Sequence, residues 1–106
     1  MFGRKSNELI IPPQAKTDPD TVELLRVWSA RGQQHVSIHA EAWNDPAVWG
    51  ICLVDLARHV ANFYSQEHGR DHLAVLKRIR EGFDAEWGSP TSEATGAILY
   101  DDDKDA

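Results

Sequence analysis

The chain has 106 residues, of which 42% are hydrophobic and 26% are charged, and this size and composition are typical of one folded domain. Its formal charge of −6 argues against a nucleic-acid-binding protein, because phosphate recognition needs a concentrated excess of lysine and arginine. The single cysteine, Cys52, excludes an intrachain disulfide and a cysteine-rich zinc site, and fits a reducing compartment. No apolar run reaches the length of a signal peptide or a membrane span, so we expect a cytoplasmic protein without a membrane partner.

Three segments are expected along the chain. Residues 1–20 are predicted to be a flexible or extended N-terminal segment, 21–100 a single α+β domain, and 101–106 a disordered acidic tail. Within the first segment, Leu9-Ile10-Ile11 followed by Pro12-Pro13 predicts a short extended piece, which could serve as an edge strand.

Two strands are predicted in the first half of the domain. Residues 21–30 are rich in β-branched and aromatic side chains, and 31–34 resemble a hairpin loop. Residues 35–42 alternate strictly, with Val36 and Ile38 on one face and His35 and His39 on the other. Residues 97–100 are expected either to add an edge strand or to dock on the surface.

A long helix should begin at Asn44 or Asp45, which can accept hydrogen bonds from free backbone amides, and end near Gln66 with Gly69 as its stop. One apolar stripe is typical of an inward helix face and comprises Trp49, Cys52, Leu53, Leu56, Val60, Phe63 and Tyr64. Val48, Ile51 and Val54 lie outside this stripe. The start of the helix is therefore apolar on all sides and needs a second apolar neighbour, either within the fold or in a second copy of the chain.

Asp71 is predicted to cap a second helix, which ends at Gly88-Ser89-Pro90. A single apolar stripe on this helix comprises Leu73, Leu76, Ile79, Phe83 and Trp87, opposite a charged face. The short link around Gly69 favours an antiparallel helix pair. The expected fold is α+β, with an antiparallel hairpin or meander of two to three strands packed against a C-terminal two-helix hairpin.

One candidate catalytic group lies on the long helix, where a spacing of three or four residues places Asp55, Arg58, His59 and Asn62 on one side. A carboxylate one turn before a histidine could orient the imidazole as a general base, with Arg58 as an anion anchor. A structural ion pair explains the same residues, because a charge near a buried helix start needs a partner. We favour this structural interpretation.

A weaker hypothesis is a divalent-metal site at His39 and Glu41, completed by His59 or His72. His39 and Glu41 would project from the same strand face, but the chain contains no standard zinc spacing. A solvated strand face is the favoured interpretation. The chain also lacks a nucleophile elbow, a Walker loop and a Gly-x-Gly-x-x-Gly motif, so we expect no cofactor.

The chain resembles a small family of uncharacterised bacterial proteins of about the same length, a domain of unknown function. The resemblance covers roughly residues 20–92 and lies in Val27-Trp28, Gln34-His35-Val36-Ser37, Asp45-Pro46, Trp49-Gly50, Leu53-Val54-Asp55-Leu56-Ala57-Arg58-His59, Ile79-Arg80-Glu81-Gly82-Phe83, Ala85-Glu86-Trp87 and Pro90-Thr91. It implies a bacterial cytoplasmic protein and transfers no activity and no catalytic residue.

We expect a non-enzymatic binding or interaction module that acts as a homodimer, with an unidentified protein or small-molecule partner. Val48, Ile51 and Val54 are the predicted dimer interface, because an apolar helix start can meet its own copy across a two-fold axis. The alternative is a small α+β enzyme or ligand-binding protein with a pocket between sheet and helices, which uses His59, Asp55 and Arg58.

Overall fold

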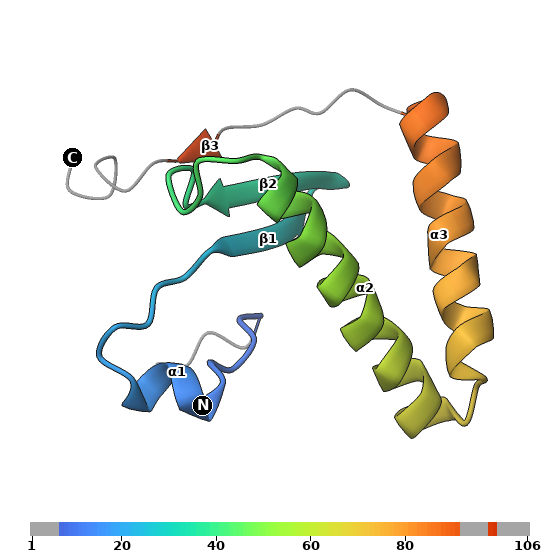
Figure 1. Cartoon of the computed structure of the whole chain (residues 1–106), viewed down its shortest axis with the longest axis horizontal. Helices are drawn as coiled ribbons and strands as arrows, with labels where there is room; N and C mark the ends of the chain where they lie inside the picture. The colour runs from blue at the N-terminus through green and yellow to red at the C-terminus, as the bar shows by residue number, and fades with distance from the viewer. Residues whose placement is uncertain (1–6, 92–97, 100–106) are drawn as a thin grey trace.

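The computed structural model describes residues 7–91 and 98–99. Its elements follow the order α1 (Pro13–Thr17), β1 (Leu25–Ala30), β2 (Gln33–Ile38), α2 (Ala47–His68), α3 (His72–Gly88) and β3 (Ile98–Leu99) (Figure 1). A two-stranded antiparallel hairpin is thus followed by two long helices. This confirms the predicted α+β class.

The hairpin is joined by a two-residue turn. Arg31 and Gly32 both have positive φ, 54° and 74°, which matches the right-handed twist of the flanking strands and is tolerated best where the second residue is glycine. Val27 pairs with Val36 and Ala30 with Gln33, so β2 begins two residues earlier than predicted. The polar Gln33-Gln34 pair had suggested a loop, but both glutamines are exposed at the end of the ladder, where polar side chains are tolerated.

Both strands are shorter than the sequence predicted. β1 begins at Leu25 instead of residue 21, and β2 ends at Ile38 instead of 42. The amide of His39 still donates to the carbonyl of Leu24, at 2.9 Å, after which the chain turns through a hydrogen bond from Ala42 to the His39 carbonyl. The alternation of residues 39–42 is therefore not a strand pattern.

The N-terminal segment forms no edge strand at 9–11. These residues are irregular and exposed, and Pro13 begins the five-residue helix α1, where proline is tolerated because the first helical amides need no acceptor within the helix. The Glu8 carboxylate accepts a hydrogen bond of 2.9 Å from Arg26 of β1. This ion pair ties the segment to the sheet.

The boundaries of α2 follow from the predicted signals. Asp45 accepts a hydrogen bond of 3.0 Å from the amide of Ala47 at the start of the helix. Gly69 ends it in the left-handed conformation, φ 65°, and its amide donates to the Ser65 carbonyl at 3.1 Å. Glycine suits this position because it has no Cβ to oppose a positive φ.

Helix α3 also begins and ends as predicted. The Asp71 carboxylate accepts a hydrogen bond of 2.9 Å from the amide of Ala74, which satisfies one of the free amides of the first turn. The last helical residue is Gly88. With only residues 69–71 between them, α2 and α3 form the predicted helical hairpin.

Strand β3 joins the sheet beside β2, in the order β1-β2-β3, and supports the edge-strand alternative for residues 97–100 over docking alone. Val36 pairs with Ile98 and Ser37 with Leu99 in parallel. The third strand therefore does not continue an antiparallel meander. A parallel neighbour requires a crossover, and here both long helices lie in that crossover.

The packed core is small and lies where α2 and α3 are close. Among the described residues, only Ala61 on α2 and Val75 on α3 are buried hydrophobic residues, with 0% and 4% of their surface exposed. Towards the other end of the hairpin the two helices diverge, so that they form a V whose closed end is the Gly69 link (Figure 1). Most of the predicted inward stripe of α2 is consequently half-exposed, and Trp87, in the predicted apolar stripe of α3, is 79% exposed.

Within the part of the chain that the structure describes, no helix is both long enough and apolar enough to span a membrane.

Candidate functional site

The main candidate site is a groove between the diverging ends of α2 and α3. Its volume is about 710 Å³. The wall from α2 contains Ala47, Gly50, Ile51, Val54, Asp55 and Arg58, and the wall from α3 contains Phe83, Asp84 and Trp87. The groove is therefore apolar towards the open end of the V and charged towards the closed end.

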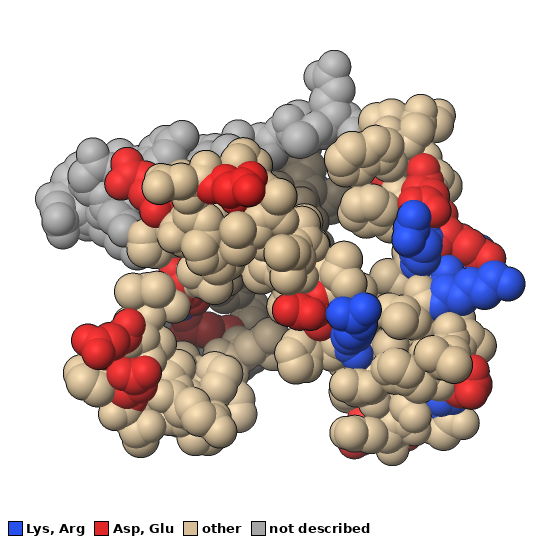
Figure 2. All heavy atoms as spheres, in the orientation of Figure 1, with Lys and Arg blue, Asp and Glu red and all other residues tan. Residues whose placement is uncertain are grey.

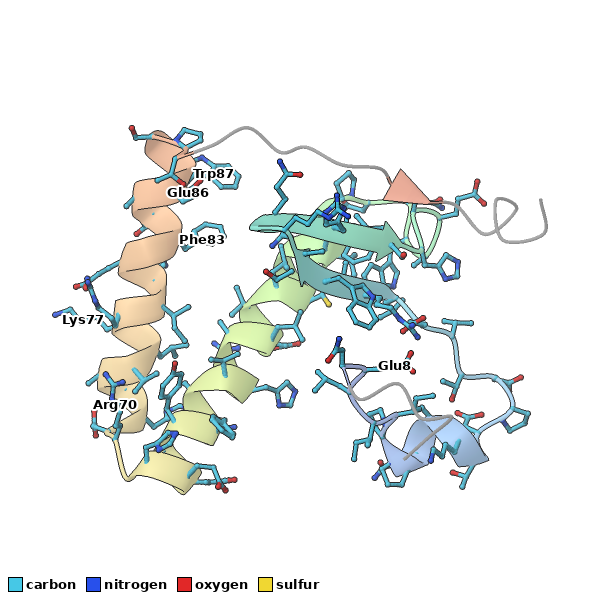
Figure 3. The ribbon with its side chains drawn as sticks, turned by 180° about the vertical axis from the view of Figure 1, so that it is seen from behind. Glu8, Arg70, Lys77, Phe83, Glu86 and Trp87 are labelled. Atoms are coloured by element: carbon cyan, nitrogen blue, oxygen red, sulfur yellow. The ribbon has the colours of Figure 1, made fainter. Side chains whose placement is uncertain are left out.

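Large apolar side chains on both walls are open to solvent. Ile51 is 63% exposed, Val54 49% and Phe83 50%. Phe83 and Trp87 project from the side of α3 that faces α2 and the sheet, whereas Lys77 projects from the opposite side (Figure 3). Exposed apolar side chains gathered on one groove are a feature that interaction surfaces and ligand-binding grooves share.

Two ion pairs lie at the charged end of the groove. Arg58 lies 3.5 Å from the Asp55 carboxylate on α2, and on α3 Arg80 donates to both oxygens of Asp84, at 2.9 and 3.1 Å. In the view of Figure 2, basic side chains gather over the two long helices, with acidic side chains beside them. Asp55 and Arg58 both line the groove from α2, whereas Asp84 lines it from α3 and is paired with Arg80 outside the lining.

The predicted catalytic group is only partly brought together. Asp55 pairs with Arg58 at 3.5 Å, but both side chains are about 60% exposed, at 60% and 58%. The premise that Asp55 is a buried charge is therefore wrong. His59 is also exposed, and it does not line the groove.

The predicted metal ligands His39 and Glu41 lie beyond the end of β2, not on one strand face. Among residues 7–91 and 98–99, no group of three or more histidine, cysteine, aspartate or glutamate side chains is placed to hold a metal ion. The described part of the chain therefore does not assemble the proposed site with His59 or His72.

The predicted interface residues have different environments. Ile51 and Val54 line the groove, whereas Val48 is half-buried and does not. The opposite wall was missed, because Phe83 and Trp87 belong to the single apolar stripe of α3, a pattern typical of an inward helix face. The apolar stripe of α3 continues unchanged from the part that packs against α2 into the part that diverges from it. The sequence therefore carries no local signal for the position at which the two helices separate.

The fold and the groove define a small α+β protein with an open helical hairpin. The chain belongs to the DUF5076 family, a domain of unknown function, whose sequence profile matches residues 8–91. A comparison with curated protein sequences finds no significant match.

The chain is also similar to a solved structure from the photosynthetic bacterium Rhodopseudomonas palustrus CGA009, named a "putative pyruvate dehydrogenase". The two are 35% identical, with a TM-score of 0.69, and the similarity covers 93% of this chain and 99% of the other. The similarity in backbone thus extends over almost the whole of both chains.

Proposed function

We propose that the protein is a small, cytoplasmic, non-enzymatic interaction module that acts as a homodimer. The observation that carries this proposal is the exposure of large apolar side chains on both walls of the groove, led by Ile51 and Trp87. Burying such a surface against a second copy would remove it from water, at a gain of about 25 cal/mol for each Å² of apolar area. The presence of a single cysteine supports the cytoplasmic location.

An enzyme or ligand-binding protein that uses Asp55, Arg58 and His59 is the less favoured alternative. A general base needs a site that orients the substrate and limits access of water. Here the carboxylate and guanidinium are mostly exposed and pair with each other, and His59 lies outside the groove. An interaction surface needs no such enclosure, and the apolar lining of the groove suits it better.

Sedimentation equilibrium over a wide concentration range tests the proposal. The expected result is a mass of twice the 11.9 kDa chain at micromolar concentrations, with reversible dissociation on dilution. A chain that stays at its monomer mass at every concentration would contradict the homodimer. The open groove would then have to be assigned to a different protein.

A further inference from the structure

We infer that the groove of each copy is occupied by the helical hairpin of the second copy, so that the two V-shaped hairpins interlock. In this arrangement Ile51 and Val54 of one copy contact Phe83 and Trp87 of the other. The inference rests on the proposed homodimer and goes beyond it, because it names the surface and the segment that fills it.

The distribution of apolar residues supports a reciprocal contact. A two-fold interface uses the same surface on both copies, so that surface must be complementary to itself. Here the aliphatic residues lie on the α2 wall and the aromatic residues on the α3 wall. Rotation about a two-fold axis brings the aliphatic wall of each copy to the aromatic wall of the other, and buries both at once.

The α2 wall can be approached closely. Ala47 and Gly50 line the groove, and a Cβ added at Gly50 would meet no atom within 4 Å in the single chain. A helix from a second copy could therefore lie against the α2 backbone at this point. The aromatic side chains beside it supply the larger contact area.

The charges at the end of the groove favour a second copy over a strongly charged partner. The chain carries a net charge of −6, so two copies repel each other in general. The groove lining is different, because it carries Arg58 beside Asp55 on the α2 wall and Asp84 on the α3 wall. A rotation that brings the α2 wall of one copy to the α3 wall of the other also brings Arg58 towards Asp84, so that Arg58 can exchange its 3.5 Å contact with Asp55 for a carboxylate of the second copy.

Disulfide trapping between two different variants tests this inference. In a Cys52→Ser background, a chain with Ile51→Cys is coexpressed with a size-tagged chain with Phe83→Cys, and mild oxidation is followed by a non-reducing gel. Because each chain has one cysteine, the mixed band can form only between copies, and only if the two Cα atoms come within about 7 Å. We expect most of the mixed pair to be trapped.

The matched control pairs Ile51→Cys with Leu73→Cys. Leu73 is also on α3 and is 71% exposed, but it lies outside the groove. We expect at least a tenfold weaker mixed band. Equal trapping of both pairs, or no trapping of either in a protein whose mass is that of a dimer, would overturn the interlocked groove and leave the homodimer standing. A wild-type chain that is monomeric throughout would overturn both.

Discussion

Phe83 and Trp87 stack on each other one turn apart on α3, with ring centroids 5.6 Å apart and an angle of 23° between their planes. The stack lies on an exposed helix face rather than in a core. The two rings therefore form a rigid aromatic surface with few side-chain torsions to restrict on binding, which is the kind of anchor that contributes most to an interface.

Replacing Trp87 by alanine should weaken self-association without unfolding the chain. Truncation of a central aromatic anchor typically costs about 2 kcal/mol or more of binding free energy, a roughly 30-fold rise in the dimer dissociation constant. Sedimentation equilibrium measures that constant. Leu73→Ala is the control for loss of an exposed apolar residue on the same helix. If Leu73→Ala weakens the dimer as much as Trp87→Ala does, the stack of Phe83 and Trp87 is not an anchor of the interface.

A charge at the start of α2 should dissociate the dimer. Ile51→Asp places a carboxylate in the proposed apolar contact, where it would be desolvated without a partner. We expect a monomer that retains its helical circular dichroism, or a chain that unfolds if the fold depends on the second copy. Val48→Asp should also dissociate the dimer, but it should destabilise the fold of the single chain more than Ile51→Asp does, because Val48 is half-buried there. An Ile51→Asp protein that remains a stable dimer would contradict the interface.

Loss of the Asp71 cap should destabilise α3. Asp71→Ala removes the 2.9 Å hydrogen bond to the Ala74 amide and should lower the free energy of unfolding by about 1 kcal/mol. Asp71→Asn is the matched control, since asparagine caps helices about as well. Urea denaturation at one fixed protein concentration compares the three chains, because the stability of a dimer depends on concentration. Equal losses for both variants would mean that the charge, not the cap, is responsible.

The same change, glycine to alanine, should have opposite effects at two positions. At Gly69, φ is 65°, and an alanine there should cost about 1 kcal/mol because its Cβ opposes the left-handed conformation. Gly82 lies inside α3 with open space around its Cα, so alanine should stabilise the helix by about 0.5 to 1 kcal/mol. Thermal unfolding of both variants and the wild type checks this: the melting temperature should fall for Gly69→Ala and rise for Gly82→Ala.

The Glu8–Arg26 ion pair should hold the N-terminal segment against β1. The hydrogen bond and charge of Glu23, followed by the charge of Glu8, raise the pKa of Arg26. The guanidinium thus stays charged up to strongly alkaline pH, and its ion pairs are lost only as pH rises through that raised pKa. Glu8→Gln should therefore speed proteolytic cleavage near residues 9–12 at neutral pH, with little change in global stability. Lys16→Gln, within α1, is the control.

The sequence predicted the helices well because their end signals are local. Asp71 and Gly69 act on backbone groups within one turn, so residue type and position were enough to place both helix ends close to where they lie. The strand ends were less accurate. Polar Gln33 and Gln34 are compatible with either a loop or the exposed end of a ladder, and only the pairing with β1 decides between them.

The site could not be predicted to the same extent. Ile51 and Val54 were singled out as candidates because a helix start that is apolar on all sides is unusual, whereas Trp87 belongs to an ordinary amphipathic stripe. Whether such a stripe meets a neighbour depends on the angle between two helices, which is a property of the whole hairpin. Asp55 shows the same limit, since its pairing with Arg58 was foreseeable from spacing but its exposure was not.

The parallel pairing of β3 with β2 has a kinetic consequence. The β1–β2 hairpin and the α2–α3 hairpin each close over short links and can form early, whereas pairing Val36 with Ile98 requires closure of a loop that contains both long helices. We therefore expect refolding in stages, with a fast phase of local structure that is independent of protein concentration. A later phase that accelerates with concentration would report assembly of the two chains. Stopped-flow traces at several chain concentrations would separate these phases.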